Sequence, residues 1–153
     1  MKYVPTSKPV IVVMTLIGLV LASMALAAQS PPAQASAEDV KKKVAETVQA
    51  IKSYSVDQRD QAVQKAKVAL EDFDARINDL ESQLVQRWDQ MGQAARQEAS
   101  SSMASLRKQR NAVAEWYGGL KHGSKQAWED VKAGFSKSCH DLGGAFNKAY
   151  QDL

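Results

Sequence analysis

Apolar residues recur at alternating steps of three and four along residues 63–84. This spacing keeps them on one face of a helix and is typical of the heptad seam of a coiled coil. The seam consists of Val63, Ala66, Leu70, Phe73, Ile77, Leu80 and Leu84. Beyond residue 84 it shifts through Trp88, Met91 and Ala95, which predicts a four-residue stutter in a continuing helix. It then resumes with Met103, Leu106, Val113, Tyr117 and Leu120.

A shorter apolar pattern precedes this seam. Val40, Val44, Val48 and Ile51 stand four, four and three residues apart and predict a helix that begins near Ser36. Serine is a favourable residue at the start of a helix. We therefore expect a first helix over about residues 36–52.

The segment Ser-Tyr-Ser at 53–55 predicts a break between these two patterns. Ser55 and Gln58 have the spacing of a capping box, so a new helix can begin there. No proline follows Pro32, and neither alternating nor β-branched strand patterns are present. The chain beyond residue 36 is predicted to be almost entirely helical.

Three glycines interrupt the pattern near residue 120. Gly118, Gly119 and Gly123 each cost about 1 kcal/mol relative to alanine inside a helix, so residues 118–124 are predicted to form a hinge. The apolar spacing keeps its phase across this hinge. The sequence therefore favours one helical path with a weakened joint, straight or folded back as a hairpin, over two unrelated domains.

The segment after the hinge, residues 125–151, is predicted to be an amphipathic helix. Its bulky apolar face is the candidate packing or binding surface and consists of Trp128, Val131, Phe135, Leu142 and Phe146. We favour packing of this face on the preceding long helix. The alternative is contact with a membrane surface, although Glu129, Asp130 and Asp141 dilute the positive charge of the segment.

These patterns predict an all-α fold. Residues 37–117 are expected to form a long coiled-coil helix or a helical hairpin, residues 118–124 the glycine hinge, and residues 125–151 a short amphipathic C-terminal helix. A continuous apolar stripe such as the one through Leu70, Ile77 and Leu84 cannot be buried by its own helix. We therefore expect a homo-oligomer, most simply a dimer. The alternative is a monomer in which the tail or residues 36–52 cover the stripe.

The first 27 residues have the features of a secretory signal peptide. Lys2 and Lys8 precede an uncharged apolar run over residues 10–28, and A-x-A cleavage patterns follow at 25–27 and 33–35. We expect cleavage after residue 27, or as late as residue 35, and a proline- and alanine-rich spacer over residues 28–36. The alternative is an uncleaved anchor in the inner membrane, since roughly 18 apolar residues can just span a bilayer.

Removal of the signal peptide leaves a nearly neutral protein. Lys2 and Lys8 account for two of the 20 basic residues, and all 17 acidic residues follow residue 35, so the net charge falls from +3 to +1. This balance does not favour nucleic acid as a partner. Cys139 is the single cysteine of the sequence, so an exported chain must fold without an internal disulfide.

Few residues offer reactive chemistry. His122 and His140 are 18 positions apart, about 27 Å along a straight helix, and can share a metal only if the hinge folds or two chains meet. Cys139 and His140 lack further ligands at the spacing of a zinc or copper site. No nucleophile stands beside a base, and no glycine-rich phosphate loop follows a strand. We predict no enzymatic activity, metal, cofactor or small-molecule substrate.

Three short patterns, L-x-x-x-R, A-W-x-x-V-K-x-G and A-F-x-K-A, stand in the last third of the chain. They are formed by Leu106 and Arg110, by Ala127, Trp128, Val131, Lys132 and Gly134, and by Ala145, Phe146, Lys148 and Ala149. With the segment LEDFDARINDLESQL at 70–84, they resemble a family of small bacterial coiled-coil proteins associated with stress responses. The resemblance covers about residues 55–150 and implies a helical stress-associated protein without transferable enzymatic chemistry.

Together these features predict a non-enzymatic, exported, periplasmic coiled-coil protein with an envelope or general stress-response role. It would act by self-association or partner binding through its helices. The alternative, from a different functional class, is a protein that binds lipid or a membrane surface through the amphipathic helix at 125–151. Members of the family mostly lack a signal peptide, so an exported relative would act in a different compartment.

Overall fold

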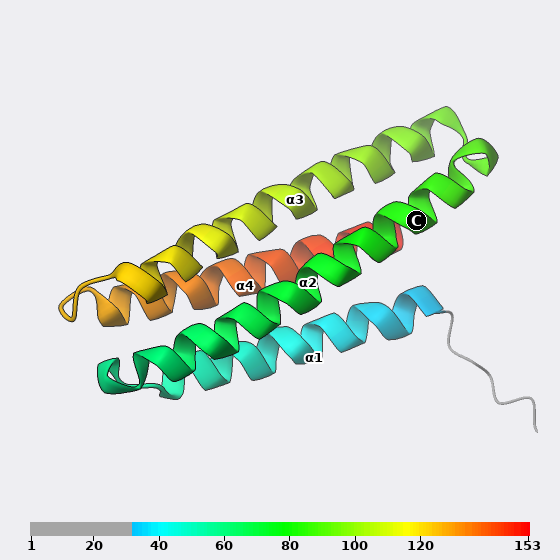
Figure 1. The fold of residues 1–153 in the computed structure, drawn as a ribbon. Helices are drawn as coiled ribbons and strands as arrows, with labels where there is room; N and C mark the ends of the chain where they lie inside the picture. Colours follow the sequence, from blue (N-terminus) through cyan, green and yellow to red (C-terminus); the bar gives the residue numbers. More distant parts are fainter. Residues whose placement is uncertain (1–31) are drawn as a thin grey trace, which may run out of the picture.

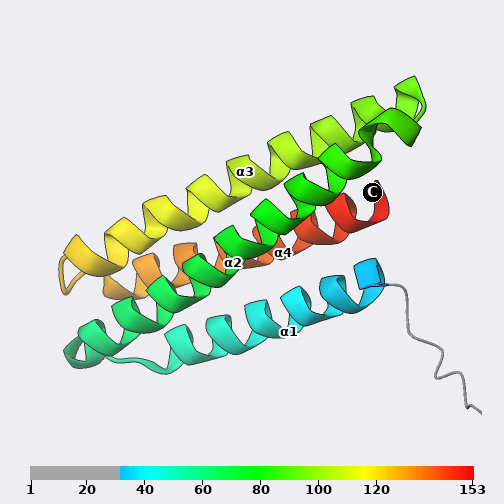
Figure 2. The ribbon, with the colours of Figure 1, turned by 45° about the vertical axis from the view of Figure 1, so that its right-hand side comes forward.

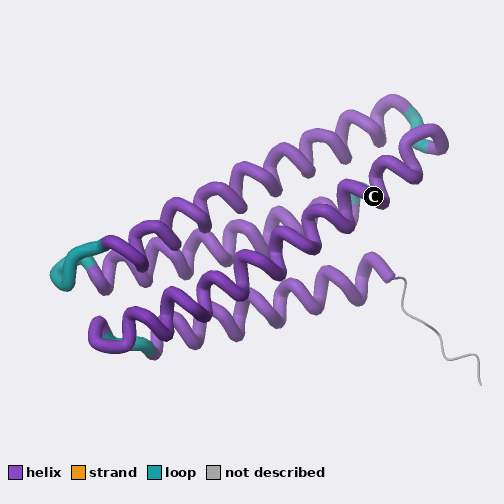
Figure 3. Tube along the Cα trace, in the orientation of Figure 1, coloured by secondary structure: helices purple, strands orange, loops and turns teal. Residues whose placement is uncertain are grey.

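The computed structural model describes residues 32–153, which form helices joined by short turns (Figures 1 and 3). The helices are α1 (Pro32–Ser53), η1 (Val56–Gln58), α2 (Arg59–Arg87), η2 (Trp88–Gln90), α3 (Gln93–His122) and α4 (Trp128–Gln151). The two η elements are single turns of 3-10 helix. No strand occurs between residues 32 and 153. The prediction of an all-α fold is confirmed.

The four α-helices form an up-down-up-down bundle in which successive helices run antiparallel (Figures 1 and 2). Each helix packs on its two neighbours in the ring α1–α2–α3–α4, and the α3–α4 interface is the most extensive. The start of α1, the α2–α3 connection and the C-terminus lie at one end, which we call the leader end because α1 starts there (Figure 1). The α1–α2 and α3–α4 connections lie at the opposite end.

The region 37–117, predicted as one coiled-coil helix or hairpin, is divided among α1, α2 and most of α3. The first chain reversal falls at Tyr54 and Ser55, inside the predicted break. The backbone N–H of Ser55 donates a hydrogen bond of 3.1 Å to Oε1 of Gln58. This contact satisfies a donor at the start of the next helix, as the capping-box spacing predicted.

The second reversal falls where the sequence predicted a stutter, and that prediction was wrong. α2 ends at Arg87, and η2 with a bend at Met91 turns the chain into α3. Gly92 precedes α3 with extended backbone angles, φ −67° and ψ 162°. The apolar spacing is a local property of each helix, so it is compatible with either a continuous helix or a reversal between two helices.

α1 begins at Pro32, four residues before the predicted start at Ser36. Proline is well accommodated in the first turn of a helix, where its missing N–H would have no intrahelical partner. Residues 32–36 of the predicted spacer therefore belong to α1. The predicted signal peptide and residues 28–31 of the spacer lie outside the described residues.

The apolar stripe of α2 is buried within one chain. Phe73 and Leu80 are fully buried, and Leu70 and Ile77 are nearly so. The rings of Phe73 and Phe146, on α4, have centroids 6.1 Å apart. α1 contributes its own buried residues to the same core: Val40, Val44, Val48 and Ile51. The tail and the first helix thus cover the stripe. Burial of the stripe therefore does not require a second chain, and the expected homo-oligomer stays a prediction.

Charged pairs at the edge of the core connect α2 with α3. Nε and Nη2 of Arg110 donate to the two carboxylate oxygens of Asp74, each over 2.6 Å. This hydrogen bonding raises the pKa of the Arg110 guanidinium above its usual value. Arg107 makes a similar contact with Glu81, where Nε donates over 2.7 Å. A bidentate pair has a narrow geometry, so it favours one alignment of the two helices.

α4 approaches a side chain of α3 closely at Gly134. A Cβ atom added at this position would lie 2.5 Å from the indole ring of Trp116. A Cβ atom added at Gly144, on the same helix, would meet no other atom within 4 Å. The ring of Trp116 therefore lies directly on the backbone of α4 at Gly134, and only glycine leaves room for it.

Gly134→Ala should destabilise the bundle although alanine is the better helix former. The gain in helix propensity is up to about 1 kcal/mol, whereas displacing Trp116 adds an overpacking cost of about 1–3 kcal/mol. Gly144→Ala is the matched control and should raise the free energy of unfolding by up to about 1 kcal/mol. Urea unfolding of both variants measures the difference. Equal stabilisation by both would mean that Trp116 moves aside without cost.

Candidate functional site

The candidate face of α4 lies in the core of the bundle. Its side chains are between 0% and 7% exposed: Trp128, Val131, Phe135, Leu142 and Phe146. They pack among the other three helices. A membrane or a partner protein would reach this face only if α4 left the bundle. No helix within residues 32–153 is both long and apolar enough to cross a bilayer.

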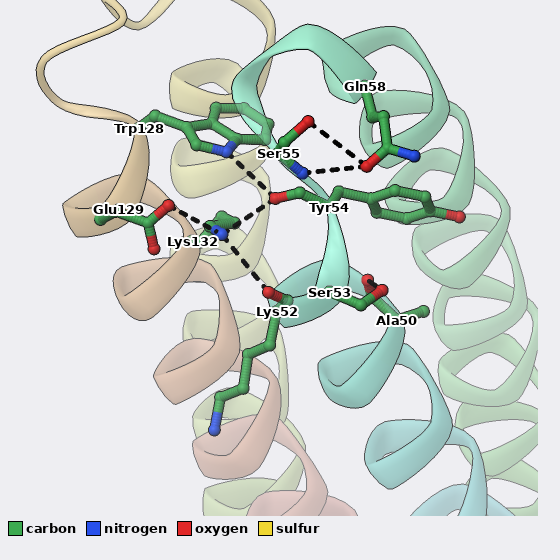
Figure 4. Close-up of polar contacts among 9 residues, drawn as sticks. All are labelled: Ala50, Lys52, Ser53, Tyr54, Ser55, Gln58, Trp128, Glu129 and Lys132. Carbon is green, nitrogen blue, oxygen red and sulfur yellow. Dashed lines mark hydrogen bonds and ion pairs between the residues drawn. The ribbon is translucent and has the colours of Figure 1, made fainter.

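Polar side chains at the start of α4 meet the end of α1 (Figure 4). Nζ of Lys132 donates to the carbonyl oxygens of Lys52, over 3.3 Å, and Tyr54, over 2.9 Å. Nε1 of Trp128 also donates to the Tyr54 carbonyl, over 3.2 Å. The carboxylate of Glu129 lies 2.9 Å from Nζ of Lys132. We call these five residues the α1–α4 junction.

The junction satisfies carbonyl groups that the end of a helix leaves without an intrahelical partner. It also places a positive charge at the negative end of the α1 dipole. A buried ammonium group is unfavourable unless it is paired and hydrogen-bonded. Lys132 is 6% exposed, and its three donors match the two carbonyls and Glu129. Lys132 is therefore a cap for α1 that comes from a different helix.

Two cations lie near the ring of Trp128. The guanidinium carbon of Arg59 is 5.4 Å, and Nζ of Lys132 5.9 Å, from its ring centroid. Both distances are within the range of cation–π attraction. The pattern A-W-x-x-V-K-x-G thus has a structural explanation: Trp128 and Lys132 close the end of α1, and Gly134 admits the ring of Trp116.

The three glycines of the predicted hinge lie within and just after α3. Gly118 and Gly119 are helical, Gly123 follows the last residue of α3, and none has a positive φ. A Cβ atom at Gly118 would meet nothing, and a Cβ atom at Gly119 would lie 3.2 Å from a side-chain atom of Val131. At Gly123 a Cβ atom would lie 2.6 Å from the carbonyl oxygen of Gly119 and 3.3 Å from a side-chain atom of Val131. Two of the glycines therefore lie where α3 and α4 approach closely, and the chain reverses at residues 123–127, which begin with Gly123.

The candidate reactive residues are not brought together. Cys139 is fully buried, and this desolvation raises the pKa of its thiol to about 12. His140 is exposed at the rim of a groove of about 430 Å³ between α1 and α4. His122 is the last residue of α3 and lies at the end of the bundle that is opposite to the leader end. No three His, Cys, Asp or Glu side chains of residues 32–153 are grouped as metal ligands.

A small apolar surface remains at the leader end. Val85 is 76% exposed and Trp88 36% exposed, while Leu84 and Met91 are half-buried. All four residues lie where α2 passes into α3. We call them the tip patch. Two of the four large apolar side chains that are exposed within residues 32–153 belong to it.

Sequence reasoning identified the apolar face of α4 but missed the polar contacts around it. Lys132 is not part of the apolar face that the sequence predicts. Two features of the sequence point to a joint role of Trp128 and Lys132. They stand four residues apart, which places them on one side of a helix, and both belong to the A-W-x-x-V-K-x-G pattern. The sequence does not reveal the tip patch, because the three-four spacing predicts that Trp88 and Met91 continue the apolar seam.

Lys132→Met should destabilise the protein because it keeps an apolar stem but removes the cap from α1. Losing hydrogen bonds from a charged group to the part-buried carbonyls of Lys52 and Tyr54 costs about 1–3 kcal/mol. Lys137→Met is the matched control, since Lys137 is exposed on α4 and pairs with Asp141 four residues on; such a pair contributes at most about 0.5 kcal/mol. Chemical unfolding of both variants measures this. Similar losses for both would contradict the capping role.

Cys139 should resist alkylation in the native protein and react freely after unfolding. With its pKa raised to about 12, the reactive thiolate is roughly a few thousandfold rarer than in an unfolded cysteine of pKa ~8.5. The contribution of this neutral thiol to stability is complete below the unfolded pKa and is lost as pH rises toward 12. Iodoacetamide labelling at pH 8, followed by mass spectrometry, tests the native reactivity. Rapid modification without denaturant would contradict the enclosed thiol.

Comparison with known proteins gives no match. The chain matches no family model, no curated protein and no solved structure. The likeness to bacterial stress-response proteins therefore depends on the three short patterns and on the segment at 70–84. What the protein does is argued below from its own residues.

Proposed function

We propose that this protein is a non-enzymatic, exported helical bundle that acts in an envelope or general stress response by binding other envelope components. One observation carries the proposal: the polar side chains with the most specific geometry hold the helices together. Lys132 caps α1, Arg110 pairs with Asp74, and Asp152 accepts hydrogen bonds from Lys148 and Ser102. These contacts serve structure and leave the outer surface for binding.

The distribution of reactive groups supports a binding role over catalysis. The Cys139 thiol is enclosed and protonated, which removes the residue that could act as a nucleophile. The two histidines lie on different helices and at different levels of the bundle. A catalytic site needs a nucleophile, a base and a charge-stabilising group within hydrogen-bond reach of one another.

Self-association is the second proposed mode of action. The α2 stripe that suggested it is covered within the chain, so contact between copies would use surface residues. Such an interface would be smaller and more polar than the coiled-coil seam expected from the sequence. Binding to other envelope components through the surface is therefore the mode that we favour.

Export and stress function can be tested together by complementation. Deleting the gene should reduce survival under envelope stress, and the full chain should restore it. A chain without residues 1–27 should fail because it stays in the cytoplasm. N-terminal sequencing of the periplasmic protein should find a start near residue 28 or 36. Full rescue by the chain without residues 1–27 would refute the exported role.

The non-enzymatic part of the proposal predicts that reactive side chains are dispensable. His122→Ala and His140→Ala, alone and combined, should rescue as well as the native chain, since both positions are exposed. Lys121→Ala serves as a neighbouring control on α3. Loss of rescue by a histidine variant that still accumulates in folded form would indicate chemistry at that residue.

A further inference from the structure

α1 contributes less bulky side chains to the core than α4 does. The buried apolar residues of α1 are three valines and one isoleucine, whereas α4 buries a tryptophan, two phenylalanines and a leucine among others. Hydrophobic stabilisation grows with the apolar area that is buried, so α1 leaves the bundle at a lower cost than α4. α1 and α2 also diverge toward the leader end (Figures 1 and 2), and the larger interface of α1 is with α4.

Two buried hydroxyl groups weaken the packing of α1 and α4. Thr47 lies on the buried face of α1, and Ser136 is buried on α4. Ser136 stands four residues after Lys132 and seven before Gly143, which both contact α1, so it lies on the side of α4 that is turned to α1. Neither hydroxyl oxygen has a hydrogen-bond partner within residues 32–153. A buried polar group without a partner is unfavourable, and water satisfies it once the helices separate.

The hydrogen bonds that fasten α1 to α4 lie at the C-terminal end of α1. They are the contacts of Lys132 and Trp128 at the α1–α4 junction (Figure 4). Toward the leader end, a groove of about 430 Å³ lies between α1 and α4. α2 and α3, in contrast, are joined along their length by the bidentate pair of Arg110 with Asp74 and by a second arginine pair. α1 is therefore held most specifically beside its two-residue connection to α2.

We propose that α1 is a lid that moves away from the bundle about Tyr54 and Ser55 while α2, α3 and α4 stay packed. The movement uncovers Cys139, which stands four residues before Gly143 and seven after Lys132 and so lies on the side of α4 beneath α1. Elements that bury little apolar surface open more readily than the whole protein unfolds. The lid gives the bundle a closed and an open state, and a partner that binds the open state better shifts the balance toward it.

Alkylation of Cys139 in the native full chain measures the opening, because the thiol reacts only while it is uncovered. Val44→Ala loosens α1 and should speed this slow reaction about tenfold. Val113→Ala, at a buried valine of α3, is the matched control. It destabilises the three helices that stay packed in the open state, so it should leave the rate unchanged. Equal acceleration by both variants would show that the thiol is reached only by global unfolding, and the proposal would fail.

A disulfide between α1 and α4 tests which helix moves. A Cβ atom added at Gly143 would lie 3.8 Å from Cβ of Val44, a separation that suits a disulfide. In a full chain with Cys139→Ala, the oxidised variant Val44→Cys/Gly143→Cys should slow amide hydrogen exchange of α1 by about tenfold or more. Reduction of the disulfide should restore the exchange. Gly119→Cys/Val131→Cys, for which the Cβ atoms would lie 3.9 Å apart, joins α3 to α4 and should leave exchange of α1 unchanged.

Exchange in the chain without added cysteines completes the test. α1 should exchange faster than the middles of α2, α3 and α4, because it opens while they stay packed. A common rate for all four helices, or equal slowing of α1 by both disulfides, would mean that the bundle opens only as a whole and would overturn the proposal. These measurements use purified protein, so their outcome is independent of any stress phenotype and of the proposed binding function.

Discussion

The apolar stripe of α2 has to be removed from water, and the rest of the structure depends on this constraint. A helix of 29 residues with one apolar face is unstable alone, because most helical stability in proteins comes from packing that face. The chain covers the stripe by reversing direction three times and laying α1, α3 and α4 around it. Phe73, Leu80, Phe135 and Phe146 then share one core.

Directional contacts at the rim of this core determine how the helices align. Hydrophobic burial is non-directional, so it permits neighbouring helices to slide by a turn. Lys132 reaches the carbonyl groups at the end of α1, and the Arg110–Asp74 pair joins α3 to α2. Near the leader end, hydrogen bonds from Lys148 and Ser102 lower the pKa of Asp152. Contacts at both ends of α4 therefore favour a single register.

The packing of the bundle also limits which residues can function. Residues that the sequence offers as binding or reactive sites are part of the core. The apolar face of α4 and the thiol of Cys139 are enclosed, and Gly119 and Gly123 lie at the close approach of α3 to α4. What remains available is the outer surface and the two ends. These ends differ: the leader end exposes Val85 and Trp88, whereas polar residues such as Lys121 and Lys125 are exposed at the other.

The sequence by itself determined the helical class and several local features. The absence of proline after Pro32 and the three-four spacing specify helices, the Ser-Tyr-Ser segment marks the first reversal, and the expected helix at 125–151 corresponds closely to Trp128–Gln151. Only the tertiary structure decided that the chain also reverses at Trp88–Gly92, and that Lys132 caps a helix whose carbonyl groups lie up to 80 residues away in sequence. Helical periodicity records which face of each helix is buried. It carries no information about which partner buries that face, because that choice depends on contacts between residues far apart in the chain.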